Sequence, residues 1–158
     1  MNITDGQGFV HALPVVLYVE DHAVNLLLMR ALFERKPDVE LICATSGHHA
    51  RAIAPKLSPS LLLLDLRLPD CHGSDLLRQL RELPSCRTVP AVAVTADSDF
   101  DISGTGFVEL WSKPLDLHVV LNRLEALMQA DSPHGVASPL PERLATGQLS
   151  PSCSQLLA

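Results

Sequence analysis

The stretch LLLLDLRLPDCHG, residues 61–73, decides the fold that we expect for this chain. Its four leucines run directly into Asp65, and Pro69 and Gly73 are residues that end a strand in a turn. A short apolar run bounded in this way is typical of a strand buried on both faces of a parallel sheet. Asp65 is therefore predicted at the carboxyl end of a buried strand, at the edge where open α/β sheets bind ligands.

Two interpretations of Asp65 are open from this stretch alone. An aspartate at the end of a strand is common as a helix cap or turn residue, whose carboxylate accepts a backbone N–H. A carboxylate at that edge also suits a nucleophile or a metal ligand, since a buried charge needs a compensating partner. The choice between a turn role and a chemical role for Asp65 depends on the other residues predicted at the same edge.

Strands and helices alternate on both sides of this stretch. Each further strand is predicted from a short run of apolar or β-branched residues, at 15–20, 40–45, 90–95 and 107–111. Apolar residues at helical spacing predict four helices, at about 23–36, 47–56, 74–83 and 115–128. This alternation predicts an α/β fold with parallel strands, right-handed crossovers and helices on both faces. Five strands fit a doubly wound, flavodoxin-like sheet of order 2-1-3-4-5.

Residues 14–130 are predicted to form one domain. The chain has 158 residues, of which 47% are hydrophobic, and this is enough for a packed core. Residues 1–13 are mostly polar and are predicted to be a flexible N-terminal extension. Residues 131–158 contain several Pro, Ser and Gly with little periodicity, and they are predicted to be a flexible tail.

Composition argues against several classes of protein. The formal net charge is −6 and no run of Lys or Arg stands out, so we expect no direct binding to nucleic acid. No apolar run has the length of a membrane span, and the first residues lack the pattern of a signal peptide. The cysteine spacing contains no C-x-x-C pair, which favours reduced thiols and a cytoplasmic location; the four are Cys43, Cys71, Cys86 and Cys153.

Polar residues end or follow four of the five predicted strands. Glu20 and Asp21 follow the first, Asp65 the third, Thr95 the fourth and Lys113 the fifth. Because the carboxyl ends of parallel strands lie along one edge, we expect these side chains to meet. Three neighbouring carboxylates repel one another, and Mg²⁺ with its preference for oxygen ligands suits such a site. Lys113 and the hydroxyl of Thr95 are suited to bind phosphoryl oxygens. The set therefore favours phosphoryl transfer with Asp65 as the carboxylate nucleophile.

Taken together, these residues resemble the receiver domain of bacterial two-component response regulators. The resemblance covers residues 14–130 and depends on Glu20-Asp21, on Asp65 with the loop LPDCHG, on Thr95-Ala96 and on Lys113-Pro114. Residues 18–32, YVEDHAVNLLLMRAL, look most like receivers fused to hybrid histidine kinases. The resemblance implies a phosphoacceptor signalling domain of a phosphorelay, with a histidine kinase or phosphotransfer protein as its partner.

The resemblance also implies roles for individual residues. Asp65 is the phosphoacceptor, and Thr95 and Lys113 assist the transfer. Mg²⁺ is held by Asp21, by Asp65 and by the backbone carbonyl of Arg67, with Glu20 helping through water. On this basis we expect no enzyme activity beyond self-catalysed phosphoryl transfer and autodephosphorylation.

Two other functions stay open. A degenerate receiver that serves only as a protein-binding scaffold is one of them, because the segment after Thr95 is unusually short. The second is a phosphatase or hydrolase with an aspartyl nucleophile. Such enzymes usually carry a second aspartate two residues after the nucleophile as general acid, and Arg67 at that position cannot play this part.

The segment between Thr95 and Lys113 departs from the family pattern. It is rich in residues that disfavour a helix, namely Asp97, Asp99, Asp101, Ser103, Gly104 and Gly106. We therefore expect the fourth helix of the family to be shortened or missing. Residues 97–106 are predicted to be the most mobile part of the domain.

The first predicted helix has two apolar stripes. One stripe is assigned to the core and consists of Val24, Leu27, Leu28, Ala31 and Leu32. The second stripe is Leu26, Met29 and Phe33, which either widens the core or offers a surface to a partner. In the second case we expect a homodimer through the first and last helices, in which this stripe meets Leu117, Leu121 and Met128.

Overall fold

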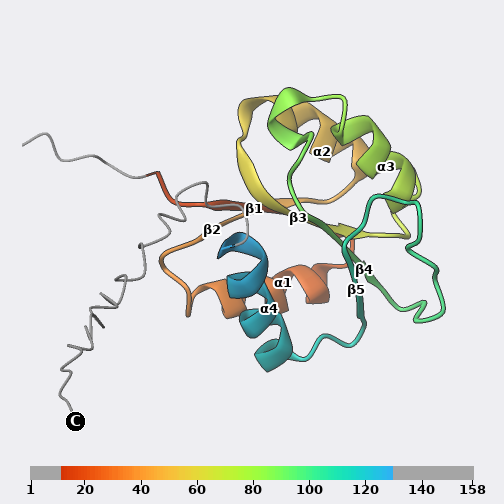
Figure 1. Ribbon diagram of the computed structural model, residues 1–158. Helices are drawn as coiled ribbons and strands as arrows, with labels where there is room; N and C mark the ends of the chain where they lie inside the picture. The colour runs from red at the N-terminus through yellow and green to blue at the C-terminus, as the bar shows by residue number, and fades with distance from the viewer. Residues whose placement is uncertain (1–11, 130–158) are drawn as a thin grey trace, which may run out of the picture.

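The strand predicted from the leucine run is β3, Pro59–Asp65, and it lies at the centre of the sheet. The computed structural model describes residues 12–129, so the tail at 131–158 and nearly all of the extension at 1–13 lie outside the described residues. The sheet order is β2-β1-β3-β4-β5 and each adjacent pair is parallel (Figure 1). The predicted fold class and strand order are confirmed.

The remaining elements follow the prediction closely. The other strands are β1 (Val15–Val19), β2 (Glu40–Ala44), β4 (Ala91–Thr95) and β5 (Glu109–Ser112). The helices are α1 (Ala23–Phe33), α2 (Gly47–Ile53), α3 (Gly73–Leu80) and α4 (Leu117–Gln129). Two short 3₁₀ turns are η1 (Ala54–Lys56) and η2 (Pro84–Cys86). No helix within residues 12–129 combines the length and the hydropathy of a membrane span.

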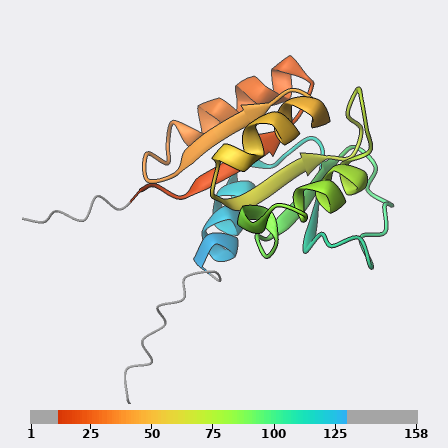
Figure 2. The same ribbon diagram turned by 90° about the horizontal axis from the view of Figure 1, so that it is seen from above.

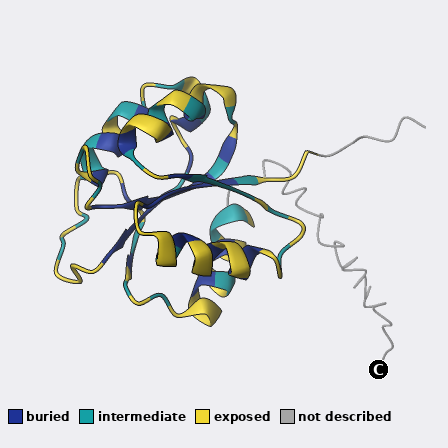
Figure 3. Cartoon of the chain, turned by 180° about the vertical axis from the view of Figure 1, so that it is seen from behind, coloured by how far each residue is buried: buried dark blue, intermediate teal, exposed yellow. Residues whose placement is uncertain are grey.

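Two layers of helices cover the sheet, and the leucines of β3 pack into both. Leu62 and Leu64 belong to the core cluster beneath α2 and α3. Leu61 and Leu63 belong to the cluster on the opposite face, beneath α1 and α4. All four are fully buried, and Figure 3 shows the buried sheet between helices whose outer faces are exposed. A run of four leucines is therefore what a strand with no solvent-exposed face requires.

No helix connects β4 to β5 in the described part of the chain. Residues 96–108 form turns and bends instead, and Figure 2 shows this green-to-teal trace passing outside the sheet without a helical coil. The predicted loss of the fourth helix is confirmed. The segment nevertheless contacts the core, because Phe107 is buried and both Phe100 and Ile102 pack against the cluster beneath α2 and α3.

The assignment of the first stripe of α1 to the core is wrong for most of its residues, and the second stripe takes the core alternative. Leu26, Met29 and Phe33 are the core residues, only 7%, 2% and 6% exposed. Val24, Leu27 and Leu28 are 59%, 67% and 52% exposed, although Leu32 is buried as predicted. Because Leu26, Leu27, Leu28 and Met29 are consecutive apolar residues, their pattern does not fix which side of the helix faces the sheet. A homodimer through the stripe of Leu26, Met29 and Phe33 is ruled out, since these side chains are already packed.

Candidate functional site at the carboxyl edge of the sheet

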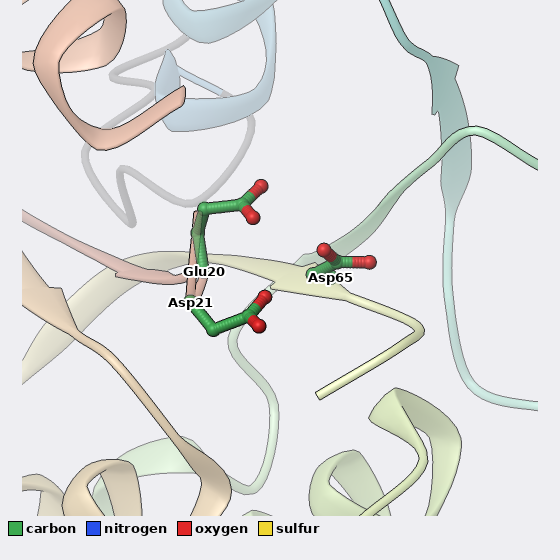
Figure 4. A group of neighbouring side chains, drawn as sticks. All are labelled: Glu20, Asp21 and Asp65. Carbon is green, nitrogen blue, oxygen red and sulfur yellow. The ribbon is translucent and has the colours of Figure 1, made fainter. Parts of the chain in front are cut away.

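The structure brings the predicted site residues together at one edge of the sheet. Glu20 and Asp21 follow β1, Asp65 ends β3, Thr95 ends β4 and Lys113 follows β5. One carboxylate oxygen from each of the three acids lies within 4.8 Å of the others. Figure 4 shows these three side chains extending from the ends of two neighbouring strands. The parallel order of the strands places them there, as predicted.

Lys113 links the two buried acids of this group. Its Nζ lies 2.6 Å from Glu20 Oε2 and 2.6 Å from Asp65 Oδ2. Desolvation acts to lower the pKa of Lys113, but hydrogen bonds to Asp65 and Glu20 outweigh it, and the pKa lies above its ordinary value. The ammonium group therefore stays charged and offsets part of the repulsion between the carboxylates.

Glu20 is fully buried, and each of its oxygens has a donor. Oε1 accepts the backbone N–H of His22 at 3.0 Å, and Oε2 accepts the hydroxyl of Tyr18 at 3.1 Å in addition to Lys113. Burial, together with the charge of Glu20, raises the pKa of Tyr18 well above its ordinary value, so its hydroxyl remains a donor. Tyr18 is not among the site residues predicted from sequence, although alternation along β1 places residues 18 and 20 on the same face of the sheet.

Asp65 combines a turn with a charged contact. Its Oδ1 accepts the backbone N–H of Arg67 at 2.9 Å, which is the turn role expected of an aspartate at a strand end. Its Oδ2 accepts Lys113, and the residue is 5% exposed. The turn interpretation is thus confirmed at Oδ1, and Lys113 at Oδ2 is the compensating partner that a buried carboxylate needs.

The loop between β3 and α3, residues 66–72, is held closely against the end of β3. Gly73 donates its N–H to Leu66 O at 2.9 Å, and a Cβ at Gly73 would overlap the carbonyl oxygen of Asp65. Asp70 reaches across to α2, where its two oxygens accept the N–H groups of Gly47 and His48 at 2.8 and 2.6 Å. No signal in the sequence pairs Asp70 with Gly47, because the two are far apart along the chain and the contact is made by backbone amides.

Thr95 presents its hydroxyl at the same edge. The residue is 1% exposed, its Oγ1 accepts the N–H of Asp97 at 3.0 Å, and its carbonyl accepts the N–H of Lys113 at 2.8 Å. The second contact ties the end of β4 to the residue that follows β5. Thr95 and Lys113 are therefore fixed relative to each other by the backbone, independently of their side chains.

The donor set fits a hard divalent cation. Carboxylate oxygens are the protein ligands that Mg²⁺ prefers, usually one or two of them, with water completing the shell. Asp21 is exposed and has its carboxylate beside those of Glu20 and Asp65. Glu20 and Asp65 are both buried, and each accepts a hydrogen bond on both of its oxygens. The exposed Asp21 is therefore the carboxylate best placed to bind a cation directly.

Comparison with protein families gives one clear match. Residues 16–125 match the model of the response regulator receiver domain. Among curated proteins, the chain is 32% identical over 115 residues to the signal transduction histidine-protein kinase BarA of Shigella flexneri, covering 68% of this chain and 12% of that kinase. It is 36% identical over 81 residues to the polar-differentiation response regulator DivK of Brucella ovis, covering 51% of this chain and 65% of DivK.

Solved structures show the same architecture. The receiver domain of sensor histidine kinase PA1611 from Pseudomonas aeruginosa, with a magnesium ion coordinated in its active-site cleft, matches with a TM-score of 0.67. That likeness covers 75% of this chain and 99% of that one at 24% identity, and it concerns the fold alone. A CheY-like receiver domain from Methylobacillus flagellatus matches with a TM-score of 0.64 at 26% identity, covering 73% of this chain and 99% of that one.

Proposed function

Because this chain belongs to the family of response regulator receiver domains, we propose that it is a phosphoacceptor signalling domain phosphorylated on Asp65. The observation that carries the proposal is the position of the Asp65 carboxylate. It ends the central strand at the ligand-binding edge, beside Asp21 and in contact with Lys113. Lys113 would place positive charge beside a phosphoryl group on Asp65, and Asp21 on the other side could hold a cation.

The proposed reaction moves one phosphoryl group from a phosphohistidine to Asp65. A carboxylate oxygen of Asp65 forms a bond to phosphorus while the P–N bond to the histidine breaks. The bonding pair leaves with the imidazole ring, which takes up a proton. Lys113 and Thr95 are proposed to bind phosphoryl oxygens, Lys113 by charge and Thr95 through its hydroxyl.

We propose that Mg²⁺ binds at the acidic end of this site. Its ligands would be Asp21, Asp65 and the backbone carbonyl of Arg67, with Glu20 acting through water. The exposed Asp21 and the three-carboxylate group support this assignment, as does the magnesium ion in the receiver of PA1611. The cation supplies positive charge to the phosphoryl oxygens during the transfer.

The proposed partner is a histidine kinase or a phosphotransfer protein, acting in the cytoplasm. BarA is a histidine kinase by name, and the chain spans 12% of its length. The proposal treats the domain as a regulator with self-catalysed phosphoryl transfer and autodephosphorylation only. A homodimer through the first and last helices would have to use Val24, Leu27 and Leu28, the exposed apolar residues of α1, in place of the stripe predicted from sequence.

Intact-mass spectrometry after incubation with acetyl phosphate and Mg²⁺ tests the proposal. The wild-type chain should gain the mass of one phosphoryl group, and the gain should disappear when Mg²⁺ is chelated. Asp65→Asn should show no gain, because an amide cannot act as the nucleophile.

Asp75→Asn is the matched control for this experiment. Asp75 is an exposed acid on α3 that pairs with Arg78 and lies outside the site, so this variant should be phosphorylated like the wild type. A wild-type chain without a mass gain, or an equal gain in Asp65→Asn, would contradict the proposal.

A further inference from the structure

The only tyrosine of the chain lies directly beneath the candidate site. Tyr18 is fully buried among the side chains that face α1 and α4. Its hydroxyl donates to Glu20 Oε2 at 3.1 Å. A phenylalanine would fill the same apolar space. Within the described residues, the contact with Glu20 is the one hydrogen bond of the Tyr18 hydroxyl, and it is what distinguishes tyrosine from phenylalanine here.

Lys113 shares that acceptor atom with Tyr18. Its Nζ lies 2.6 Å from Glu20 Oε2, and it is also bound to Asp65 Oδ2 at 2.6 Å. The other oxygen of Glu20 accepts the backbone N–H of His22. If Lys113 turned away from Glu20, the hydroxyl of Tyr18 would be the donor remaining on Oε2.

We propose that Tyr18 is a positioning residue that holds Glu20 when Lys113 moves to a phosphoryl group on Asp65. The inference rests on the proposed function. A phosphoryl group attached to Asp65 brings charged oxygens to the atom that Lys113 already contacts, so Lys113 is drawn toward them and away from Glu20. Tyr18 keeps the buried oxygen of Glu20 hydrogen-bonded and the carboxylate in its place.

The two states of the site depend on Tyr18 to different degrees. Without the phosphoryl group, Glu20 Oε2 has two donors, and loss of the tyrosine hydroxyl still leaves Lys113. With the phosphoryl group in place, loss of the hydroxyl leaves a buried charged acceptor without a protein donor on that oxygen. An unsatisfied buried acceptor costs far more than the loss of one of two hydrogen bonds. Tyr18 therefore favours the phosphorylated state specifically.

Binding titrations of the full chain with Mg²⁺ and with beryllofluoride, an analogue of the phosphoryl group, test the inference. Tyr18→Phe removes one oxygen and keeps the ring. Its affinity for Mg²⁺ alone should stay within about twofold of the wild type, whereas beryllofluoride in saturating Mg²⁺ should bind about tenfold more weakly. Thr105→Val is the control, because it also removes a hydroxyl that donates a hydrogen bond, here to Ile102 O, away from the site; it should bind both like the wild type.

A second measurement keeps the test independent of the folding of the variant. Tyrosine labelled with a magnetic isotope at Cζ gives a single resonance in the wild-type chain, because Tyr18 is the only tyrosine. This resonance should shift when beryllofluoride and Mg²⁺ are added together, as the shared acceptor loses Lys113, and change little with Mg²⁺ alone.

The outcomes separate this inference from the proposed function. A wild-type chain that binds no beryllofluoride overturns both. A wild-type chain that binds it, with equal affinity in Tyr18→Phe or an unchanged tyrosine resonance, overturns the role of Tyr18 and leaves the phosphoacceptor function standing. An equal loss of Mg²⁺ and beryllofluoride affinity in the variant would show general damage to the site and would also overturn the inference.

Discussion

The two loops that border the site are built in opposite ways. The β3–α3 loop, residues 66–72, is tied to the elements around it, because Asp70 accepts two N–H groups of α2 and Gly73, the first residue of α3, lies against Asp65 at the end of β3. The β4–β5 segment, residues 96–108, hydrogen-bonds mostly to itself. The N–H groups of Asp99 and Ser103, for example, bond to aspartate side chains two residues earlier in the chain.

This difference separates two ways of fixing a loop. Contacts between distant elements can be lost only with a rearrangement of both elements, whereas local turns can reform in a shifted segment. The β4–β5 segment is attached mainly through the apolar side chains of Phe100, Ile102 and Phe107. We therefore expect one side of the site to be rigid and the other to be adjustable.

The largest expected effect of a single substitution lies at Gly73, where the rigid loop meets α3. In Gly73→Ala the new Cβ would overlap the Asp65 carbonyl and lie 2.9 Å from Leu66 Cα, both of them backbone atoms that cannot rotate away. We expect a loss of about 3 kcal/mol in the free energy of unfolding, measured with urea.

Gly104→Ala is the matched substitution in the adjustable segment. Gly104 has φ of 70°, but a Cβ there would meet nothing within 4 Å. Backbone strain alone should cost about 1 kcal/mol. Equal losses in the two variants would contradict the distinction between the loops.

A smaller loss is expected when the link from the rigid loop to α2 is cut. Asp70→Ala removes the acceptor of two N–H groups at the start of α2, so the urea midpoint should fall, though by less than in Gly73→Ala. Asp70→Asn keeps one acceptor oxygen and should recover part of the loss. Asp75→Ala, which removes only an exposed ion pair with Arg78, is the control and should leave the midpoint nearly unchanged.

Amide hydrogen exchange compares the two loops without any substitution. The N–H of Gly73 is bonded to Leu66 O in a packed setting, whereas those of Asp99 and Ser103 are bonded to exposed aspartates. Exchange across residues 97–106 should be faster than at Gly73, on the order of tenfold or more. Comparable protection in both places would show that the longer segment is as rigid as the loop.

The smallest effect is expected at β5, where the partly exposed ion pair between Glu109 and Arg123 gives a scale for the other contacts. Hydrogen bonding to Arg123 lowers the pKa of Glu109 below its ordinary 4.5. A lowered pKa means that the pair contributes above the unfolded value and that this contribution is lost as the pH falls through the folded value. Glu109→Gln should therefore be slightly less stable than the wild type at neutral pH, with the difference vanishing in acid. Urea unfolding at several pH values measures it, and a difference that grows on acidification would contradict the assignment.

The sequence predicted the sheet well because the strand signals were unambiguous. The leucines of β3 suit a strand buried on both faces of a parallel sheet. The meeting of the polar side chains at one edge follows from the parallel order of the strands. The loss of the helix after β4 was equally visible, because glycines and aspartates disfavour a helix whatever surrounds it.

Features that depend on tertiary packing were not predictable in the same way. The first stripe of α1 was wrongly assigned to the core, because Leu26, Leu27, Leu28 and Met29 are consecutive apolar residues and their spacing does not fix which side of the helix is buried. The contact of Asp70 with Gly47 joins a loop to the start of α2 through a backbone amide, which leaves no trace in residue type. Tyr18 lies between these cases, since alternation aligned it with Glu20 but did not show that the two would touch.

The open surroundings of Gly104 have a consequence for protein engineering. Apart from Gly104 and its two chain neighbours, no heavy atom of the described residues lies within 4 Å of the position that a Cβ would take there, and the neighbouring hydrogen bonds close over only a few residues. A loop of this kind accepts added chain at little entropic cost, because the cost of closing a loop rises slowly with its length. A fluorescent reporter module inserted after Gly104 should leave the sheet intact and, since the segment directly follows Thr95, should lie only a few residues along the chain from the site whose state it is meant to report.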